Sequence, residues 1–146
     1  MPIYNKIIVA IDPYVDSDEI MTKAKSMLAK GGAIEIVFVV EIEISFSGAP
    51  FAPPIIDLPS THVKTRSVAR ELLQELAKKH QLSEENTHVL TGSAAKEIRN
   101  FAIEKDADCI TIGSHGRHGI GLLLGSTASS VIHGTPCDIL VVKIKS

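Results

Sequence analysis

The chain has 146 residues, of which 45% are hydrophobic and 22% are charged. This balance is that of one globular domain over residues 1–146 and excludes disordered and fibrous classes of protein. The net charge of -2 gives no electrostatic reason to expect nucleic acid or an acidic membrane as a partner. No run reaches the roughly 18 apolar residues of a membrane span, and the first residues do not resemble a signal peptide. We therefore expect a cytoplasmic protein.

Five short β-branched runs without polar alternation predict strands that are buried on both faces. The expected strands are Lys6–Asp12, Ile34–Val40, Thr87–Thr91, Asp108–Gly113 and Asp138–Ile144. Helical periodicity lies between these runs, with start and stop signals at serines and glycines. The first helix is expected to begin at its cap Ser17 and to end at Gly31–Gly32, and the second to begin at Ser60 or Thr61. The third is capped by Ser93, with Ile98 and Ile103 inward. The fourth runs from about Ser126 to His133.

Strands that alternate with helices predict the α/β class. Such a chain forms βαβ crossovers, which place parallel strands side by side with helices on both faces. The sequence thus predicts a single doubly wound, five-stranded, mostly parallel sheet. In such sheets ligands bind beyond the carboxyl ends of the strands, where the strand order reverses. That rule selects Asp12, the segment after Val40 and the loop after Gly113. Asp12 has a second interpretation, as a cap for the following helix.

The segment Glu41–Pro59 has no regular periodicity and contains four prolines. Its length exceeds that of usual connections, which suggests a function or disorder. Apolar residues such as Phe46 and Ile55 argue against disorder. We expect the segment to cover the ligand or to form a contact surface; the alternative is that it packs on the neighbouring helix.

A glycine-rich segment follows the fourth predicted strand, with five glycines in the 13 positions from Gly113 to Gly125. Glycine lets backbone N–H groups approach a ligand without an intervening Cβ. Gly125-Ser126-Thr127 then opens a helix, whose first N–H groups suit a phosphate. The residues alone leave two interpretations open: a phosphate site, or a mobile loop that ends in a serine helix cap.

The glycine spacing is that of a known family. Gly113-Ser-His-Gly116 is followed by Gly125-Ser126 after eight residues, where the family's nucleotide-binding motif usually has nine. Together with the first strand and the last two strands, this motif makes the chain resemble the universal stress protein family, in its ATP-binding branch. The resemblance covers nearly the whole chain except Glu41–Pro59.

The resemblance implies an adenine-nucleotide alpha-hydrolase-like (Rossmann-like) fold and ATP as the ligand, with or without Mg²⁺. It implies adenosine contacts at Ala10, Ile11, Asp12 and Val40. A carboxylate such as that of Asp12 can accept a hydrogen bond from an amine or a ribose hydroxyl. The implied ribose and phosphate contacts are Gly113, Ser114, His115, Gly116, Arg117, Gly125, Ser126, Thr127 and Ala128.

No catalytic constellation is recognisable in the sequence. The P-loop, the dinucleotide fingerprint after the first strand and the serine nucleophile elbow are all absent. We expect an ATP-binding stress-response or regulatory protein that acts through nucleotide-dependent conformation or partner contacts. Two alternatives stay open: a slow ATP hydrolase, and a dimeric interaction protein that no longer binds nucleotide.

The remaining chemistry-bearing residues favour structural roles. Cys109 and Cys137 lie in apolar runs and lack Cys-x-x-Cys spacing, which predicts buried structural thiols rather than a redox pair. The histidines away from the glycine-rich segment show no metal-ligand spacing and are expected at the surface or in packing; they are His62, His80, His88 and His133.

The last predicted strand, Asp138–Ile144, is apolar at nearly every position. In the expected fold it is an edge strand, and an exposed apolar edge is an aggregation hazard unless it is paired. Pairing with the same strand of a second chain removes the hazard with two-fold symmetry. The sequence therefore predicts a homodimer, an arrangement that also resembles how the family dimerises.

Overall fold

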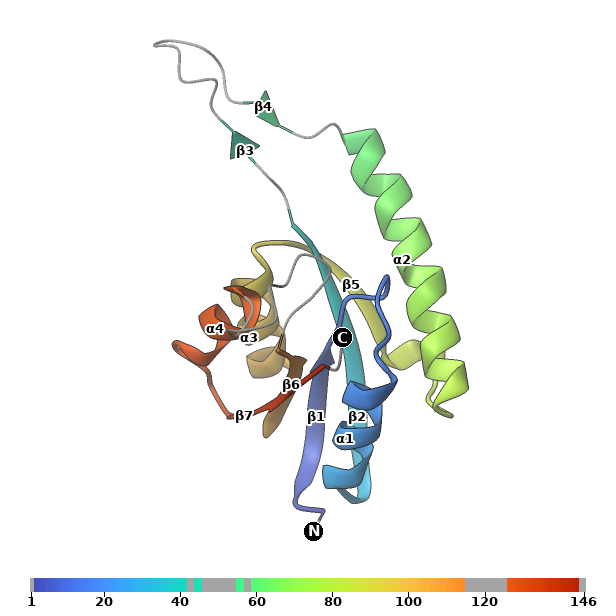
Figure 1. Ribbon diagram of the computed structural model, residues 1–146, viewed down its shortest axis with the longest axis vertical. Helices are drawn as coiled ribbons and strands as arrows, with labels where there is room; N and C mark the ends of the chain where they lie inside the picture. Colours follow the sequence, from blue (N-terminus) through green and yellow to red (C-terminus); the bar gives the residue numbers. More distant parts are fainter. Residues whose placement is uncertain (1, 42–43, 46–54, 57–58, 115–125, 145–146) are drawn as a thin grey trace.

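The protein is described by a computed structural model that places residues 2–41, 44–45, 55–56, 59–114 and 126–144. One five-stranded sheet forms its centre, with strands in the order β5-β2-β1-β6-β7. Every neighbouring pair in that sheet is parallel, which confirms the predicted architecture (Figure 1). The strands are β1 (Tyr4–Ala10), β2 (Leu28–Glu41), β5 (Thr87–Gly92), β6 (Cys109–Gly113) and β7 (Asp138–Val142).

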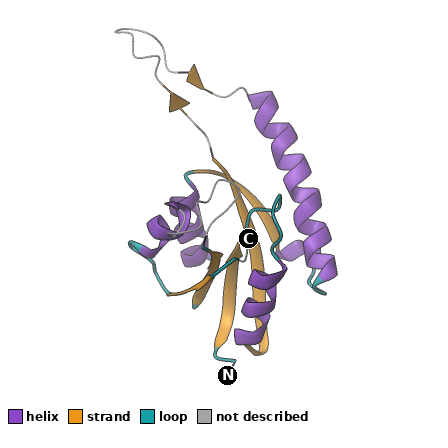
Figure 2. Ribbon diagram, in the orientation of Figure 1, coloured by secondary structure: helices purple, strands orange, loops and turns teal. Residues whose placement is uncertain are grey.

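Helices cover both faces of the sheet (Figure 2). The apolar side chains of α1 (Asp18–Met27) and α2 (Pro59–Lys79) share one buried core, and those of α3 (Ala94–Glu104) and α4 (Ser126–Ile132) share the other. The chain therefore runs on one face from β1 through β2 to β5, and on the other face it crosses from β5 to β6 and continues to β7. The strand order reverses between β1 and β6.

Each core strand contributes to both cores, because successive side chains of a strand point to opposite faces. On β1, Ile7 and Val9 face α1 and α2, whereas Ile8 and Ala10 face α3 and α4. All four side chains are almost fully buried. This two-sided burial is the physical reason for continuous apolar runs in the sequence.

The first helix ends earlier than the sequence predicts. It stops at Met27, and β2 already begins at Leu28, so the predicted helix end at Gly31–Gly32 is wrong. Tyr4 pairs with Leu28 and Lys6 with Ala33, so residues 29–32 stand opposite Asn5 alone. Gly31 has a φ of +81°, and a Cβ on Gly32 would lie 2.8 Å from the Asn5 carbonyl oxygen. The two glycines allow the irregular backbone at the start of β2, because one has a positive φ and the other lies against the neighbouring strand.

Other boundaries also differ from the expectation. The segment predicted to be irregular contains two short antiparallel strands, β3 (Ile44–Ser45) and β4 (Ile55–Ile56), and the rest of residues 42–58 lies outside the described residues. Helix α2 begins at Pro59, one residue before the predicted Ser60, which suits proline at a helix start. Strand β7 ends at Val142 rather than Ile144, and α4 ends at Ile132.

Two side chains on the helices are placed differently from the prediction. Ser17 precedes α1, but its hydroxyl donates to the carbonyls of Asp12 and Val15 and caps no helix N–H. Ile103 is 63% exposed, and Phe101 is buried in its place beside Ile98 and Ala102. The inward face of α3 thus keeps Ile98 and Ala102 but includes Phe101 instead of the predicted Ile103.

Candidate functional site

The predicted ligand site is built on two adjacent strands. Ala10 of β1 pairs with Ile112 of β6, so Asp12 and Ser114 each lie two residues beyond the same rung of the sheet. This rung is at the carboxyl ends of the strands, where the strand order reverses. In open α/β sheets this is the position at which ligands bind. The structure therefore brings Asp12 and the beginning of the glycine-rich segment together, as the sequence predicted.

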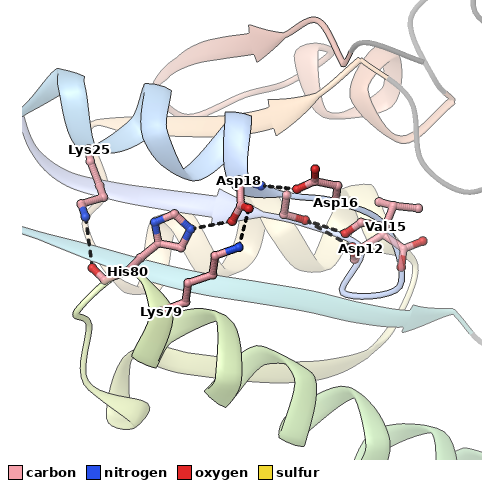
Figure 3. A network of polar contacts seen from close by, with 8 residues as sticks. Asp12, Val15, Asp16, Asp18, Lys25, Lys79 and His80 are labelled. Atoms are coloured by element: carbon pink, nitrogen blue, oxygen red, sulfur yellow. Dashed lines mark hydrogen bonds and ion pairs between the residues drawn. The ribbon is translucent and has the colours of Figure 1, made fainter.

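Asp12 is held in a defined orientation by the loop that follows it. Its Oδ1 accepts a hydrogen bond from the backbone N–H of Tyr14 at 2.9 Å, which closes an Asx turn. Its carbonyl accepts from the N–H of Val15 and, at 3.4 Å, from the hydroxyl of buried Ser17 (Figure 3). The half-buried carboxylate of Asp12 can accept from an amine or a hydroxyl at the strand end.

Gly113 and Ser114 contact the end of the chain. A Cβ on Gly113 would lie 2.5 Å from Cδ1 of Ile144 and 3.0 Å from Cδ1 of Ile20, so a larger residue here would require these two side chains to shift. The N–H of Ser114 donates to the Val142 carbonyl at 2.8 Å, and its hydroxyl accepts from the N–H of Ile144 at 3.3 Å. Ser114 thus ties the glycine-rich segment to the residues beyond β7.

Most of the remaining candidates that the structure describes have side chains in the two cores. Ala10, Ile11, Val40 and Ala128 are each at most 7% exposed, so their side chains are part of the packing. Thr127, in the first turn of α4, is half-buried. The candidates His115, Gly116, Arg117 and Gly125 lie outside the described residues, and Ser126 is placed as the first residue of α4.

Comparison with known families decides the identity of this fold. The model of the universal stress protein family matches residues 3–143. Universal stress protein A homologs 1 and 2 of Coxiella burnetii are 33% and 35% identical over 144 residues, which is 97% of this chain and 98% and 97% of the relatives. The chain belongs to the universal stress protein family.

Solved structures agree with the fold of this universal stress protein. UspA from Lactobacillus plantarum has a TM-score of 0.70 at 20% identity and covers 95% of this chain and 97% of that chain. A universal stress protein in complex with cAMP has a TM-score of 0.62 at 19% identity and covers 96% of this chain and 97% of that chain. Both share the parallel sheet with helices on its two sides, which confirms the predicted fold class.

The structure adds a polar cluster beside the site that the sequence did not indicate. Asp18, the first residue of α1, lies 2.6 Å from the ammonium of Lys79 and 2.9 Å from Nε2 of His80, both at the end of α2 (Figure 3). The hydrogen bonds from Lys79 and His80 hold the pKa of the Asp18 carboxyl below its usual range, and Asp18 in turn raises the pKa of Lys79. We call these three residues the α1–α2 clamp.

A second cluster lies on the opposite face of the sheet, near the amino ends of the strands. Glu35 is only 8% exposed, with Oε2 2.6 Å from Nε2 of His88 and Oε1 3.6 Å from the ammonium of Lys6. The His88 ring also contacts Phe101, with ring centroids 4.8 Å apart. His88 therefore has a packing role, as expected, but also partners a buried carboxylate. Two residues on neighbouring strands form this pair, so no local sequence spacing reveals it.

The cysteines are structural thiols, as predicted for Cys109 and in part for Cys137. Cys109 is fully buried in the core under α1 and α2, while half-buried Cys137 packs against the other core. Side chains on opposite faces of a sheet cannot form a disulfide without moving the backbone. Burial raises the pKa of the Cys109 thiol to about 11, which makes it a poor nucleophile.

Two features are absent from the residues that the structure describes. Among them, no group of three or more histidine, cysteine or acidic side chains is arranged to hold a metal ion. Within the same part of the chain, no helix combines the length and the apolar character that crossing a membrane would need.

Proposed function

We propose that this universal stress protein binds ATP, with or without Mg²⁺, and acts in the stress response through nucleotide-dependent conformation or partner contacts. One observation carries the proposal: Asp12 and the first residues of the glycine-rich motif lie across one rung at the carboxyl ends of β1 and β6. The adenosine is expected at Asp12 and the neighbouring strand ends. The phosphates are expected on Gly113–Thr127, since glycine-rich backbone and helix N–H groups suit anionic oxygens.

The Asp12 carboxylate is the described side chain best suited to test ATP binding. Asp12→Asn keeps an oxygen that can accept from the Tyr14 N–H and removes the charge. If the carboxylate accepts a hydrogen bond from the nucleotide, this change weakens ATP binding by about 10- to 100-fold, the worth of a hydrogen bond to a charged group. Isothermal titration calorimetry with ATP and Mg²⁺ measures the change.

Asp16→Asn is the matched control for that variant. Asp16 lies in the same loop, is exposed, and accepts a hydrogen bond from the Asp18 N–H at 3.0 Å in the same way. Asparagine keeps an oxygen that can accept this hydrogen bond, so the loop contact is retained, and the substitution is expected to change ATP affinity less than about twofold. Equal losses in the two variants would show a general effect of loop charge and would remove Asp12 from the binding site.

A cyclic nucleotide is the second candidate ligand, because one structural neighbour is a complex with cAMP. The two ligands share adenosine and differ in the phosphates, so competition separates them. An extended glycine-rich phosphate site favours the triphosphate, and we expect cAMP to bind at least about tenfold more weakly than ATP. Tighter binding of cAMP would replace ATP as the proposed ligand.

We also propose that the protein is a homodimer joined along β7. β7 is an edge of the sheet, and its central residues Ile139, Leu140 and Val141 are only partly buried in the single chain. An isologous pairing of two β7 edges would cover them and would satisfy the outer backbone groups. Light scattering at micromolar concentration is expected to give twice the chain mass of 15.7 kDa. A single-chain mass would contradict this.

A further inference from the structure

Two sets of polar contacts, joined by the backbone of residues 16–18, lie between Asp12 and the end of α2 (Figure 3). The Asp12 carbonyl accepts from Val15 and Ser17, and Ser17 in turn accepts through its carbonyl from the N–H of Met21 in α1. Asp16 fixes the first N–H of the helix, that of Asp18. The Asp18 carboxylate then reaches Lys79 and His80. The loop of residues 12–17 is thus anchored at one end in β1 and at the other in the α1–α2 clamp.

Packing between this loop and α2 is incomplete. An open groove with a cavity of about 210 Å³ separates the two, lined by Pro13 and Val15 of the loop and by Leu72 and Leu76 of α2. A cavity removes the dispersion contacts that close packing would supply. The loop's hold on α2 therefore depends strongly on the polar contacts of Asp18. Lys25 adds to them with a hydrogen bond to the His80 carbonyl at 3.2 Å.

We propose that Asp18, Lys79 and His80 are positioning residues of the nucleotide site. They contact no ligand themselves; they order the loop of residues 12–17 and so fix the orientation of the Asp12 carboxylate before nucleotide arrives. Ordering a loop in advance removes an entropy cost from binding. This inference rests on the proposed function of Asp12. It gives the end of α2 a part in ligand affinity, although Lys79 lies 67 residues along the chain from Asp12.

Lys79→Met is the sharpest test, because it removes the shorter of the two contacts between the end of α2 and Asp18 and leaves both Asp12 and the start of α1 unchanged. Exposed ion pairs contribute up to about fivefold in an equilibrium constant, so we expect ATP affinity to fall about threefold. Lys78→Met is the matched control. Lys78 is the exposed neighbour in the same last helical turn, and its loss is expected to leave ATP affinity unchanged within error. Equal effects of the two substitutions would overturn the inference.

A double-mutant cycle separates positioning from a general structural effect. If the clamp acts through the Asp12 carboxylate, Lys79→Met weakens ATP binding in the unaltered chain but has almost no further effect in an Asp12→Asn background. Independent contributions would instead add. Calorimetry with ATP and Mg²⁺ on the four proteins gives the coupling. The same threefold loss in both backgrounds would overturn the inference.

Amide exchange tests the clamp without any nucleotide. The N–H groups of Tyr14 and Val15 donate to Asp12, so opening the clamp is expected to raise their exchange rates about threefold, the same shift as in affinity. Lys78→Met is expected to leave them unchanged. Unchanged exchange in Lys79→Met would overturn the inference. Absence of ATP binding by the unaltered chain would instead overturn the proposed function, and the exchange rates would then decide alone whether the clamp orders the loop.

Discussion

His88 is expected to be among the most sensitive positions outside the candidate site. The carboxylate of Glu35 is 8% exposed and lies 2.6 Å from His88, while Lys6 stands at 3.6 Å, beyond ordinary hydrogen-bond distance. His88→Phe removes the close donor and keeps an aromatic ring against Phe101. Losing a hydrogen bond to a buried charged group costs about 1.5–3 kcal/mol, so we expect the free energy of unfolding to fall by about 2 kcal/mol.

Urea unfolding followed by circular dichroism measures this change, and thermal unfolding should show a melting temperature lower by about 6 °C for a chain of this size. Adding Glu35→Met removes the carboxylate that His88→Phe leaves without its close donor. Because an apolar pair in place of a buried polar pair is often neutral, the double variant should return to within about 1 kcal/mol of the original stability. A free energy of unfolding of the single variant within about 0.5 kcal/mol of the original would refute this role of Glu35. A double variant that is as unstable as the single one would refute it too.

Three further predictions follow from single contacts. Gly113→Ala is expected to destabilise the fold by about 1 kcal/mol, because its methyl meets Cδ1 of Ile144. Ile144→Val lacks that carbon and should make the alanine nearly neutral in urea unfolding. The buried Cys109 thiol, with its pKa raised to about 11, should resist iodoacetamide at about pH 8 in the folded protein and react once urea unfolds it. The hydrogen bond to Asp138 raises the pKa of Tyr4 to about 12. Its contribution to stability should be complete below about pH 10 and be lost as the pH rises toward 12. An absorbance titration of a Tyr14→Phe protein, in which Tyr4 is the remaining tyrosine, checks that value.

The sheet was predictable because its strands are buried on both faces. Runs such as Ile7–Ala10 have no polar partner face, and this pattern together with the intervening helices determines a parallel α/β fold. The start of β2 was not predictable. Gly31–Gly32 predicts a helix end. The strand nevertheless begins before the glycines, because Leu28 pairs with Tyr4 of β1. A tertiary contact overrides the local stop signal there.

The candidate site also contains residues that the sequence predicts and residues that it does not. Asp12 and Gly113 were found from strand ends and glycine spacing, both of which are local signals. The α1–α2 clamp was not found, because Asp18 meets Lys79 and His80 only after two crossovers bring α1 and α2 together on one face. The same reason conceals the contact of Gly113 with Ile144, which gives this glycine a packing role in addition to its proposed ligand role.

We have proposed that ATP binds at the carboxyl ends of β1 and β6. The most direct test of this proposal is a titration of the amide resonances of the whole chain with ATP and Mg²⁺. We expect saturable shifts at Ala10–Asp12, at Gly113–Ser114 and at Thr127. The resonances of the 3₁₀ turn Glu84–Asn86, which precedes the amino end of β5, should not shift. Shifts centred on that turn would contradict this proposal. So would the absence of any shift up to about 1 mM ATP, a concentration at which even very weak binding would be seen.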